Sequence, residues 1–515
     1  MRRTLFAALA LTAAAVSAEV VSFKDAGKIK SWDAWSDHKG ADKATSVLAK
    51  EKRCVTWEKF RKTDPGLELL GTLKTRTSAE IKGSQWSIGC ETMDRDYADW
   101  NSFKELVPML GVKHARFFSG WAKTEQEKGK YDFTWLDPHI RECAAMGVKP
   151  WICISYGNPV WGSDFRLGMR VKQVTGDPEA FAAWIRYTKA LVERYKDVVD
   201  EWEVWNEPFG QGDDYAIMFY ETAKAVREVQ PTAQIFCTAI TYSDKPEKCD
   251  YFKVLEKLKA ENALDLGSYF IYHPYSPRPE ATFTVGTGQF VWQPALGMEK
   301  LIKEYSPKFR IMQGETGCPS QLEFAHAMHS LEWTEYSQAK WNLRRAIGDA
   351  VRSIPSSCFT MIDLKYTFML QSFGLVRSNL LEEFVYRRPS WYAMRNVYAL
   401  FDDDTLPGRI SEVACGGRML SSATFTRFGK GITVLWFSDQ VPDSSLAFSK
   451  VDLTTTLVPS CPRDLAYSDP VWVELVTGRV YRLKDFKAVP MWDSPIIIAD
   501  AETIPLATET EKKGN

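Results

Sequence analysis

Strand-like and helical segments alternate eight times between residues 85 and 400, and this rhythm constrains the fold more than any other feature of the chain. The strand candidates are short apolar runs at residues 85–91, 112–121, 149–157, 198–205, 233–241, 267–275, 309–317 and 357–364. The helical candidates cover residues 99–111, 136–147, 177–197, 213–230, 251–264, 298–305, 335–354 and 390–400. Eight such units predict an α/β fold, a (β/α)8 TIM barrel over residues 84–403. A doubly wound open sheet is the alternative, but the Gly-rich dinucleotide loop that would normally follow its first strand is missing from the sequence.

The pattern changes at residue 404. "MLSSATFTRFGKGITVLWFSD" predicts two strands around a turn at residues 429–431, "PVWVELVTGRVYRL" predicts a hairpin that turns at residues 477–478, and "PIIIAD" predicts one more strand. Residues 404–505 are therefore predicted to form a small C-terminal β-sandwich domain. Residues 19–83 are polar, and we expect them to reach this domain and to add a strand to it. Residues 506–515 are predicted to be a frayed tail.

The first eighteen residues have the pattern of a secretion signal. Arg2 and Arg3 precede an apolar run, Leu5–Val16, that is too short to span a bilayer, and Ala18 ends a small-residue cleavage site. A short membrane anchor is the alternative. No later segment has the length of a membrane span, so the mature protein is predicted to be secreted or periplasmic, without a membrane span.

Charge and cysteine content exclude several classes of function. The 65 basic residues nearly balance the 66 acidic ones, which does not favour a nucleic acid as partner. The ten cysteines form no Cys-x-x-Cys pair, so zinc bound by cysteine is not expected, and disulfide formation stays open. Nineteen tryptophans weakly favour a sugar-binding cleft, since flat aromatic faces suit sugar rings.

Two predicted strands end in carboxylates. The stretch "EWEVWNEPFG" is apolar until it reaches Asn206 and Glu207, and the seventh strand ends in Gly314 and Glu315. In a barrel of this type the C-terminal strand ends converge on the active site. Two glutamates that face each other there can hydrolyse a glycosidic bond, one as a proton donor and the other as an ionised nucleophile or base. Arg116, His273 and Tyr275 are predicted at the same mouth, where they would hold or tune these carboxylates.

"WNEP" after the fourth strand, together with "GE" on the seventh, resembles the clan A retaining glycoside hydrolases. The resemblance covers residues 85–400, including "EKGKYDFTWLDPHIRECAAMGVKP", and the added β domain makes the β-xylosidase/α-iduronidase family the nearest relative. It implies that Glu207 is the acid/base and that Glu315 is the nucleophile. The other residues that match the clan pattern, and that would bind substrate or hold the nucleophile, are Asn206, Arg116, His273 and Tyr275.

The sequence departs from this pattern at the eighth strand. Many members of the clan have a tryptophan there as a floor for the sugar, whereas this chain has "FTMIDL", with Tyr366 or Phe368 as candidates to replace it. Further predicted substrate contacts are Tyr156, Asn158 and Trp161 after the third strand and Trp292 after the sixth. The residues after the first strand, Glu91, Asp94 and Arg95, would line the mouth or cap the following helix, and Glu201 and Glu203 are expected to be structural.

The sequence therefore predicts a secreted retaining glycosidase that cleaves β-glycosidic bonds in oligo- or polysaccharides, with a carbohydrate as its partner. No cofactor and no metal are expected, because His326 and His329 lack a third ligand. A non-catalytic carbohydrate-binding protein on a degenerate barrel and a metal-dependent barrel hydrolase are the alternatives. The sugar, the linkage, endo or exo action and the oligomeric state stay open.

Overall fold

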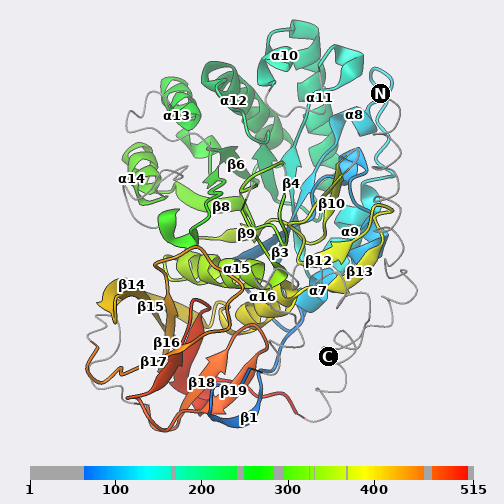
Figure 1. Cartoon of the computed structure of the whole chain (residues 1–515). Coiled ribbons are helices and arrows are strands. Elements are labelled where there is room, and N and C mark those ends of the chain that lie inside the picture. Colours follow the sequence, from blue (N-terminus) through cyan, green and yellow to red (C-terminus); the bar gives the residue numbers. More distant parts are fainter. Residues whose placement is uncertain are drawn as a thin grey trace, which may run out of the picture.

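The computed structural model of the chain describes residues 63–163, 170–239, 249–282, 295–323, 325–329, 331–366, 369–456 and 467–508 (Figure 1). The predicted secretion signal, most of the predicted N-terminal segment, Trp292 and Phe368 lie outside these residues, as does the end of the predicted tail.

Eight parallel strands close into a barrel in chain order, and β2 pairs with both β3 and β9 to complete it. The strands are β2 (Trp86–Gly89), β3 (His114–Phe118), β4 (Lys149–Ile154), β5 (Glu201–Val204), β6 (Gln234–Thr238), β7 (Tyr269–Tyr272), β8 (Arg310–Thr316) and β9 (Ser356–Cys358). Each overlaps a predicted strand. The predicted (β/α)8 barrel is thus confirmed, and closure of the sheet excludes the doubly wound alternative.

Helices cover the outside of the barrel (Figure 1). They are α6 (Trp100–Phe103), α7 (Leu106–Leu110), α8 (Trp121–Thr124), α9 (Asp137–Ala145), α10 (Val171–Thr175), α11 (Pro178–Tyr195), α12 (Gly212–Val229), α13 (Asp250–Ala260), α14 (Ala295–Tyr305), α15 (Glu335–Ala350) and α16 (Pro389–Leu400). The helix α11 shows how the sequence sets such an element. The Asp177 side chain accepts from two backbone amides at its start, Pro178 occupies the first position, and Trp184, Leu191 and Tyr195 bury one face.

The C-terminal part forms a β-rich domain. Its main antiparallel sheet has the order β1-β19-β18-β21-β16-β15-β14, and a second, two-stranded sheet pairs β17 with β20. The strands are β1 (Glu68–Thr72), β14 (Thr405–Cys415), β15 (Arg418–Arg427), β16 (Lys430–Phe437), β17 (Ser449–Val451), β18 (Pro470–Glu474), β19 (Arg479–Arg482), β20 (Val489–Met491) and β21 (Ile496–Asp500). The strand β1 comes from the predicted N-terminal segment and pairs with β19 at the edge of the main sheet.

The central strands of the main sheet are buried on both faces. In β16, Val434 and Trp436 join the core shared with the barrel, whereas Leu435 and Phe437 join a second core with the two-stranded sheet. This alternation follows from the two-residue period of a strand. The helices α15 and α16 lie between the barrel and the main sheet (Figure 1).

Buried polar contacts tie the two parts together. Arg344 of α15 donates to both carboxylate oxygens of Glu280, at 2.5 and 2.7 Å, and the indole N–H of Trp436 in β16 donates to Glu280 Oε1 at 2.8 Å. Lys340 of α15 pairs with Asp493 at 2.5 Å. The loop after β7 is thereby held by α15 and by the β domain together.

The structure differs from the predicted elements in three places. The eighth strand ends at Cys358, and the chain continues into the hairpins β10 (Leu364–Tyr366)–β11 (Met369–Gln371) and β12 (Val376–Ser378)–β13 (Phe384–Arg387). The predicted helix 99–111 is divided into α6 and α7, and the long strand β14 was not predicted. Among the helices of the described residues, none is both long and apolar enough to cross a bilayer.

Candidate active site

The C-terminal ends of the barrel strands bring several polar side chains to one mouth. They are Arg116 in β3, Asn206 and Glu207 just after β5, His273 and Tyr275 just after β7, and Glu315 in β8. These six were singled out in the sequence, and hydrogen bonds and ion pairs link all of them in the structure.

The turn after β5 presents Glu207. Both Trp205 and Glu207 have left-handed backbone angles, with φ of 62° and 52°. Such values are uncommon outside glycine and occur preferentially at functional sites. The hydroxyl of Thr238 in β6 donates to the carbonyl of Trp205 at 2.8 Å and so anchors the turn to the neighbouring strand. The Glu207 side chain is 28% exposed, against 11% for Glu315, so water and substrate have readier access to Glu207.

Arg116 organises the floor of the mouth. Nε and Nη2 donate to the two oxygens of Glu203 at 2.8 and 2.7 Å, and Nη2 also donates to Asn206 Oδ1 at 2.8 Å. Nη1 donates to Glu315 Oε2 at 2.5 Å and to Glu91 Oε1 at 3.1 Å. All five N–H groups of this fully buried guanidinium are therefore used, which fixes its plane and its partners.

Glu315 is held as an ionised carboxylate. Burial raises the pKa of its carboxyl, but the charges of His273 and Arg116 and the hydrogen bond from Tyr275 outweigh burial and leave the pKa below its ordinary value. The Tyr275 hydroxyl donates to Oε1 at 2.9 Å while Arg116 donates to Oε2. A carboxylate oriented in this way is suited to nucleophilic attack.

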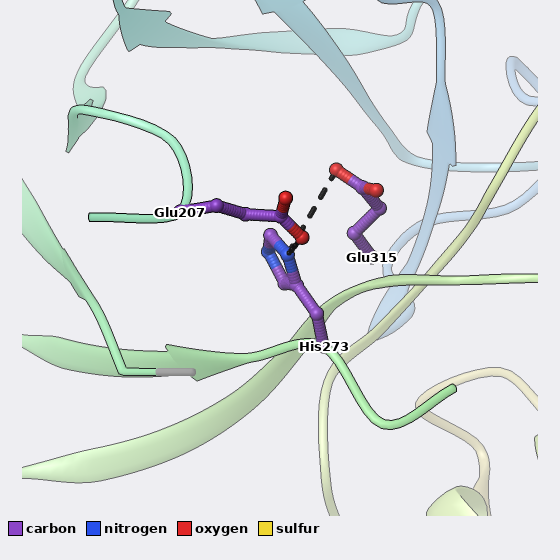
Figure 2. A group of neighbouring side chains, drawn as sticks. All are labelled: Glu207, His273 and Glu315. Atoms are coloured by element: carbon purple, nitrogen blue, oxygen red, sulfur yellow. Dashed lines mark hydrogen bonds and ion pairs between the residues drawn. The ribbon is translucent and has the colours of Figure 1, made fainter. Parts of the chain in front are cut away.

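The His273 ring lies beside the Glu207 carboxylate, with Glu315 on the other side of the site (Figure 2). Its Nδ1 is 2.9 Å from Glu207 Oε1 and 4.0 Å from Glu315 Oε2. Burial lowers the pKa of His273, but the negative charges of Glu315 and Glu207 raise it by more, so the pKa lies above its ordinary value. One oxygen of Glu207, one of Glu315 and one ring nitrogen all lie within 4.8 Å of one another.

A third carboxyl reaches this site from the first barrel strand. Glu91 lies two residues after β2 and its side chain is buried. Within the part of the chain that the structure describes, only its Oε1 has a hydrogen-bond partner, Arg116. Burial raises the pKa of Glu91 to about 8, and the nearby charge of Glu315 adds to the rise against the opposing effect of Arg116. The sequence left two roles open for Glu91, lining the mouth or capping the following helix. The structure places its side chain in the mouth.

Tyr156 and Asn206 support each other beside the nucleophile. The Asn206 Nδ2 group donates to the Tyr156 hydroxyl at 2.8 Å, while its oxygen accepts from Arg116. These two bonds orient the amide and leave its second N–H available for a substrate hydroxyl.

Arg95 also lies at the mouth. Its guanidinium carbon is 5.1 Å from the ring centroids of both Tyr97 and Tyr156, and Nε is 3.5 Å from Asp94. The following helix α6 is capped by Asp99, which accepts from the Asn101 amide. Of the two functions that the sequence left open for Arg95, the structure favours lining the mouth.

The remaining predicted contacts differ in their surroundings. Asn158 is buried and donates to the carbonyl of Glu125 at 2.8 Å, and its oxygen accepts from a backbone amide of its own loop. Because its polar atoms are used within the chain, we leave Asn158 out of the proposed substrate-binding set. The Trp161 ring lies under Lys128 Nζ at 4.0 Å, and its side chain stays a predicted contact. Trp292 lies outside the described residues.

Phe359 takes the position directly after the eighth strand. Its ring packs edge-to-face on Tyr275, with 6.4 Å between centroids, and on Phe373 at 5.8 Å. It was not identified from the sequence, although it is the first aromatic residue after the strand. Of the replacements predicted there, Tyr366 lies in β10 and Phe368 is not among the described residues.

Among the described residues, Glu207, His273 and Glu315 form the one group that could offer three ligands to a metal ion. Each carboxylate already has a protein partner, and His273 has a raised pKa that favours the cationic ring, which repels a cation. His326 and His329 do not belong to such a group; the His329 ring contacts the His326 carbonyl at 2.8 Å. This donor set fits proton transfer better than metal binding.

No protein family model matches the sequence. The fold is similar to that of a family 39 glycoside hydrolase from the gut symbiont Bacteroides cellulosilyticus WH2, with a TM-score of 0.58 and 16% sequence identity, over 81% of this chain and 80% of that chain. A GH30 endoxylanase from Clostridium papyrosolvens C71 matches with a TM-score of 0.47 and 12% identity, over 84% and 98% of the two chains. An α-L-arabinofuranosidase from Thermotoga maritima matches with a TM-score of 0.46 and 12% identity, over 85% and 98%. The predicted resemblance to the clan A glycoside hydrolases is confirmed at the level of the fold by the family 39 structure.

Proposed function

We propose that this protein is a retaining glycoside hydrolase that cleaves β-glycosidic bonds by a double displacement on Glu207 and Glu315. The observation that carries the proposal is the approach of these two carboxylates to within 4.8 Å. Retaining glycosidases have their carboxyl groups about 5–5.5 Å apart, whereas inverting enzymes need about 6.5–9.5 Å to place a water between acid and base. The short separation supports direct attack on the sugar.

In the first step Glu207 donates its proton to the glycosidic oxygen. The bond between this oxygen and the anomeric carbon breaks, and a carboxylate oxygen of Glu315 forms a new bond to the same carbon. Three features of Glu315 support its part in this step: burial, the two oriented donors, and a pKa below the ordinary value.

In the second step Glu207, now ionised, takes a proton from a water molecule that attacks the anomeric carbon. The ester bond to Glu315 breaks, and its carboxylate is restored between Arg116 and Tyr275. His273, in contact with Glu207, would hold that carboxylate while it changes from acid to base. Two inversions give net retention of configuration.

Polar groups beside Glu315 also support a carbohydrate substrate. The oriented amide of Asn206 and the hydroxyl of Tyr156 would bind sugar hydroxyls beside the nucleophile. Cleavage of β-linked oligo- or polysaccharides is the specificity that the sequence resemblance implies. Action outside the cytoplasm is inferred from the N-terminal sequence alone.

The test compares Glu315→Gln with a matched control on a panel of aryl β-glycosides and polysaccharides. Glu315→Gln should lose nearly all activity, since no carboxylate remains to attack. The control is Glu201→Gln, on β5 at the opposite end of the barrel, where the carboxylate pairs with Lys149 and His114. It should keep the parental rate.

Proton NMR of the first product, taken before mutarotation, should show the anomer of the substrate. An inverted product would rule out direct attack by Glu315. Sugar binding without any hydrolysis across the panel would favour a non-catalytic binding protein instead.

A further inference from the structure

Three carboxyl groups share the one guanidinium at the centre of the site. Arg116 donates to Glu203, to Glu315 and to Glu91, and all four side chains are buried or nearly so. Arg116, together with His273 at 4.0 Å from Glu315, supplies at most two positive charges against three carboxyls out of water, so one of the carboxyls is expected to hold a proton. The hydrogen bonds indicate which one it is.

Glu203 and Glu315 have the contacts of ionised groups. Glu203 accepts two bonds from Arg116, and its Oε1 lies 2.9 Å from the Thr238 hydroxyl, whose one proton it shares with the carbonyl of Trp205. Glu315 accepts from Arg116 at 2.5 Å and from Tyr275 at 2.9 Å. Donors on every side stabilise the charged form of a carboxylate.

Glu91 has the contacts of a neutral acid. Its one hydrogen bond, from Arg116, is the longest of the set at 3.1 Å, and its buried Oε2 has no partner among the described residues. The carboxyl folds back over Gly89, where a Cβ atom would lie 2.4 Å from Oε2. A glycine at this position makes room for the acid inside the barrel mouth.

We propose that Glu91 holds the proton of this cluster and acts as a positioning residue. Its neutral form preserves the short hydrogen bond from Arg116 Nη1 to Glu315. Ionised Glu91 would attract the guanidinium through the second N–H of Nη1 and would place a third negative charge beside it. The hydrogen bond from Arg116 to the nucleophile would then be weakened. The proposal rests on the proposed function of Glu315, but the protonation of Glu91 can be tested without any substrate.

The titratable and charged groups that face Glu91 come from several elements: Arg116 of β3, Glu203 of β5, Tyr275 after β7, Glu315 of β8, Cys358 of β9, Tyr366 of β10 and the adjacent Cys90. Of these, only Arg116 carries a positive charge. The cluster therefore opposes ionisation of Glu91, in agreement with its raised pKa of about 8.

The first test follows stability against pH for the parent and Glu91→Gln, which keeps the shape without the charge. The pKa of Glu91 is raised in the folded state, so its proton stabilises the fold below the usual value of 4.5, and this stabilisation is lost as pH rises to about 8. The melting temperature of the parent should therefore fall relative to that of the variant across this window. Glu201→Gln is the matched control, for which the expected change has the opposite sign. The hydrogen bond to His114 and the charge of Lys149 hold the pKa of Glu201 below its usual value against burial, so the parent should lose its stability advantage over this variant as the pH falls below 4.5.

The second test uses the pH dependence of kcat/KM on any glycoside that the parent cleaves. Loss of the proton on Glu91 should steepen the basic limb of the parent's profile, and Glu91→Gln, which has no such proton to lose, should show a shallower limb. Glu91→Met also lacks the charge but cannot accept the bond from Arg116, so it should share the shallower limb and have a lower rate throughout.

The two tests separate this proposal from the proposed function. A stability difference between parent and Glu91→Gln that stays constant from pH 4.5 to about 8 would show that Glu91 is ionised in the folded protein, and would overturn the proposal. So would a parental basic limb in both variants, the result expected of a purely structural residue. Failure of the parent to cleave any glycoside would overturn the proposed function, and the stability test would still decide the state of Glu91.

Discussion

At the scale of single residues, Glu207 is the side chain whose replacement distinguishes acid catalysis from substrate binding. Glu207→Gln keeps the size of the side chain but cannot donate a carboxyl proton to the leaving oxygen. The rate on natural glycosides with poor leaving groups should fall about 10²–10⁴-fold, the usual contribution of a general acid. The glycosylation step on a dinitrophenyl glycoside should fall far less, because that group departs without protonation. Equal losses on both substrates, seen in single-turnover kinetics, would point to a binding role.

Removal of metal tests whether Glu207 and its neighbours His273 and Glu315 bind an ion. Glu207, His273 and Glu315 are the group closest to a ligand set among the described residues, yet each already has a charged or hydrogen-bonding partner. We therefore expect unchanged activity after exhaustive dialysis against EDTA. A loss that zinc restores, together with metal detected in the protein by mass spectrometry, would favour the metal-dependent alternative.

Residues of the mouth could be predicted from the sequence where a polar or charged residue stands at the end of an apolar strand. Glu207 and Glu315 each end an apolar run, so position and residue type agreed. The function proposed for Glu91 could not be inferred in this way, because it depends on three carboxyls from distant strands meeting at Arg116. Asn158 shows that a polar residue after a strand need not face the mouth. Its side chain contacts its own loop and α8.

At the scale of elements, the hairpins after β9 depend on a buried ion pair. Arg388 donates to both oxygens of Asp363 at 2.6 and 2.8 Å, and neither side chain is exposed. Asp363→Ala would leave the guanidinium buried beside one remaining carboxylate, Glu335, and should destabilise the protein by about 3–5 kcal/mol. The exposed pair of Lys189 and Glu228 is the control, and Glu228→Ala should change stability by no more than about 1 kcal/mol. Urea midpoints of the two variants measure the contrast, and similar midpoints would contradict it.

The eighth strand was predicted too long because the apolar run does not end where the strand ends, at Cys358. The apolar run continues through Met361 and Ile362, so hydrophobicity alone extends the strand to Leu364. Asp363 interrupts that run, and its partner Arg388 lies 25 residues further along the chain, beyond two hairpins. A contact over that separation leaves no local signal, whereas the other barrel strands end at turns that the sequence marks with polar residues.

At the scale of the whole molecule, the barrel and the β domain share one core. Every residue of α15 from Tyr336 to Ala350 is buried, and alternate residues of β16, β18 and β21 pack in the core shared with the barrel. The loop that follows Tyr275 is held by Glu280, which accepts from Arg344 and from Trp436 of the β domain. The β domain thus supports the mouth that carries the candidate active site through this loop.

This shared core predicts that the chain unfolds in one cooperative transition. Separation of the two parts would expose the apolar face of the main sheet and the buried ion pairs of α15, and exposed apolar area costs about 25 cal/mol per Å². Calorimetry should give a single peak with equal calorimetric and van't Hoff enthalpies. Truncation after residue 403 should leave no stable barrel, because α15 and α16 would lose their cover. Two separate transitions, or a protease-resistant barrel fragment that keeps activity, would show that the parts are independent and that the loop after β7 needs no support from the β domain.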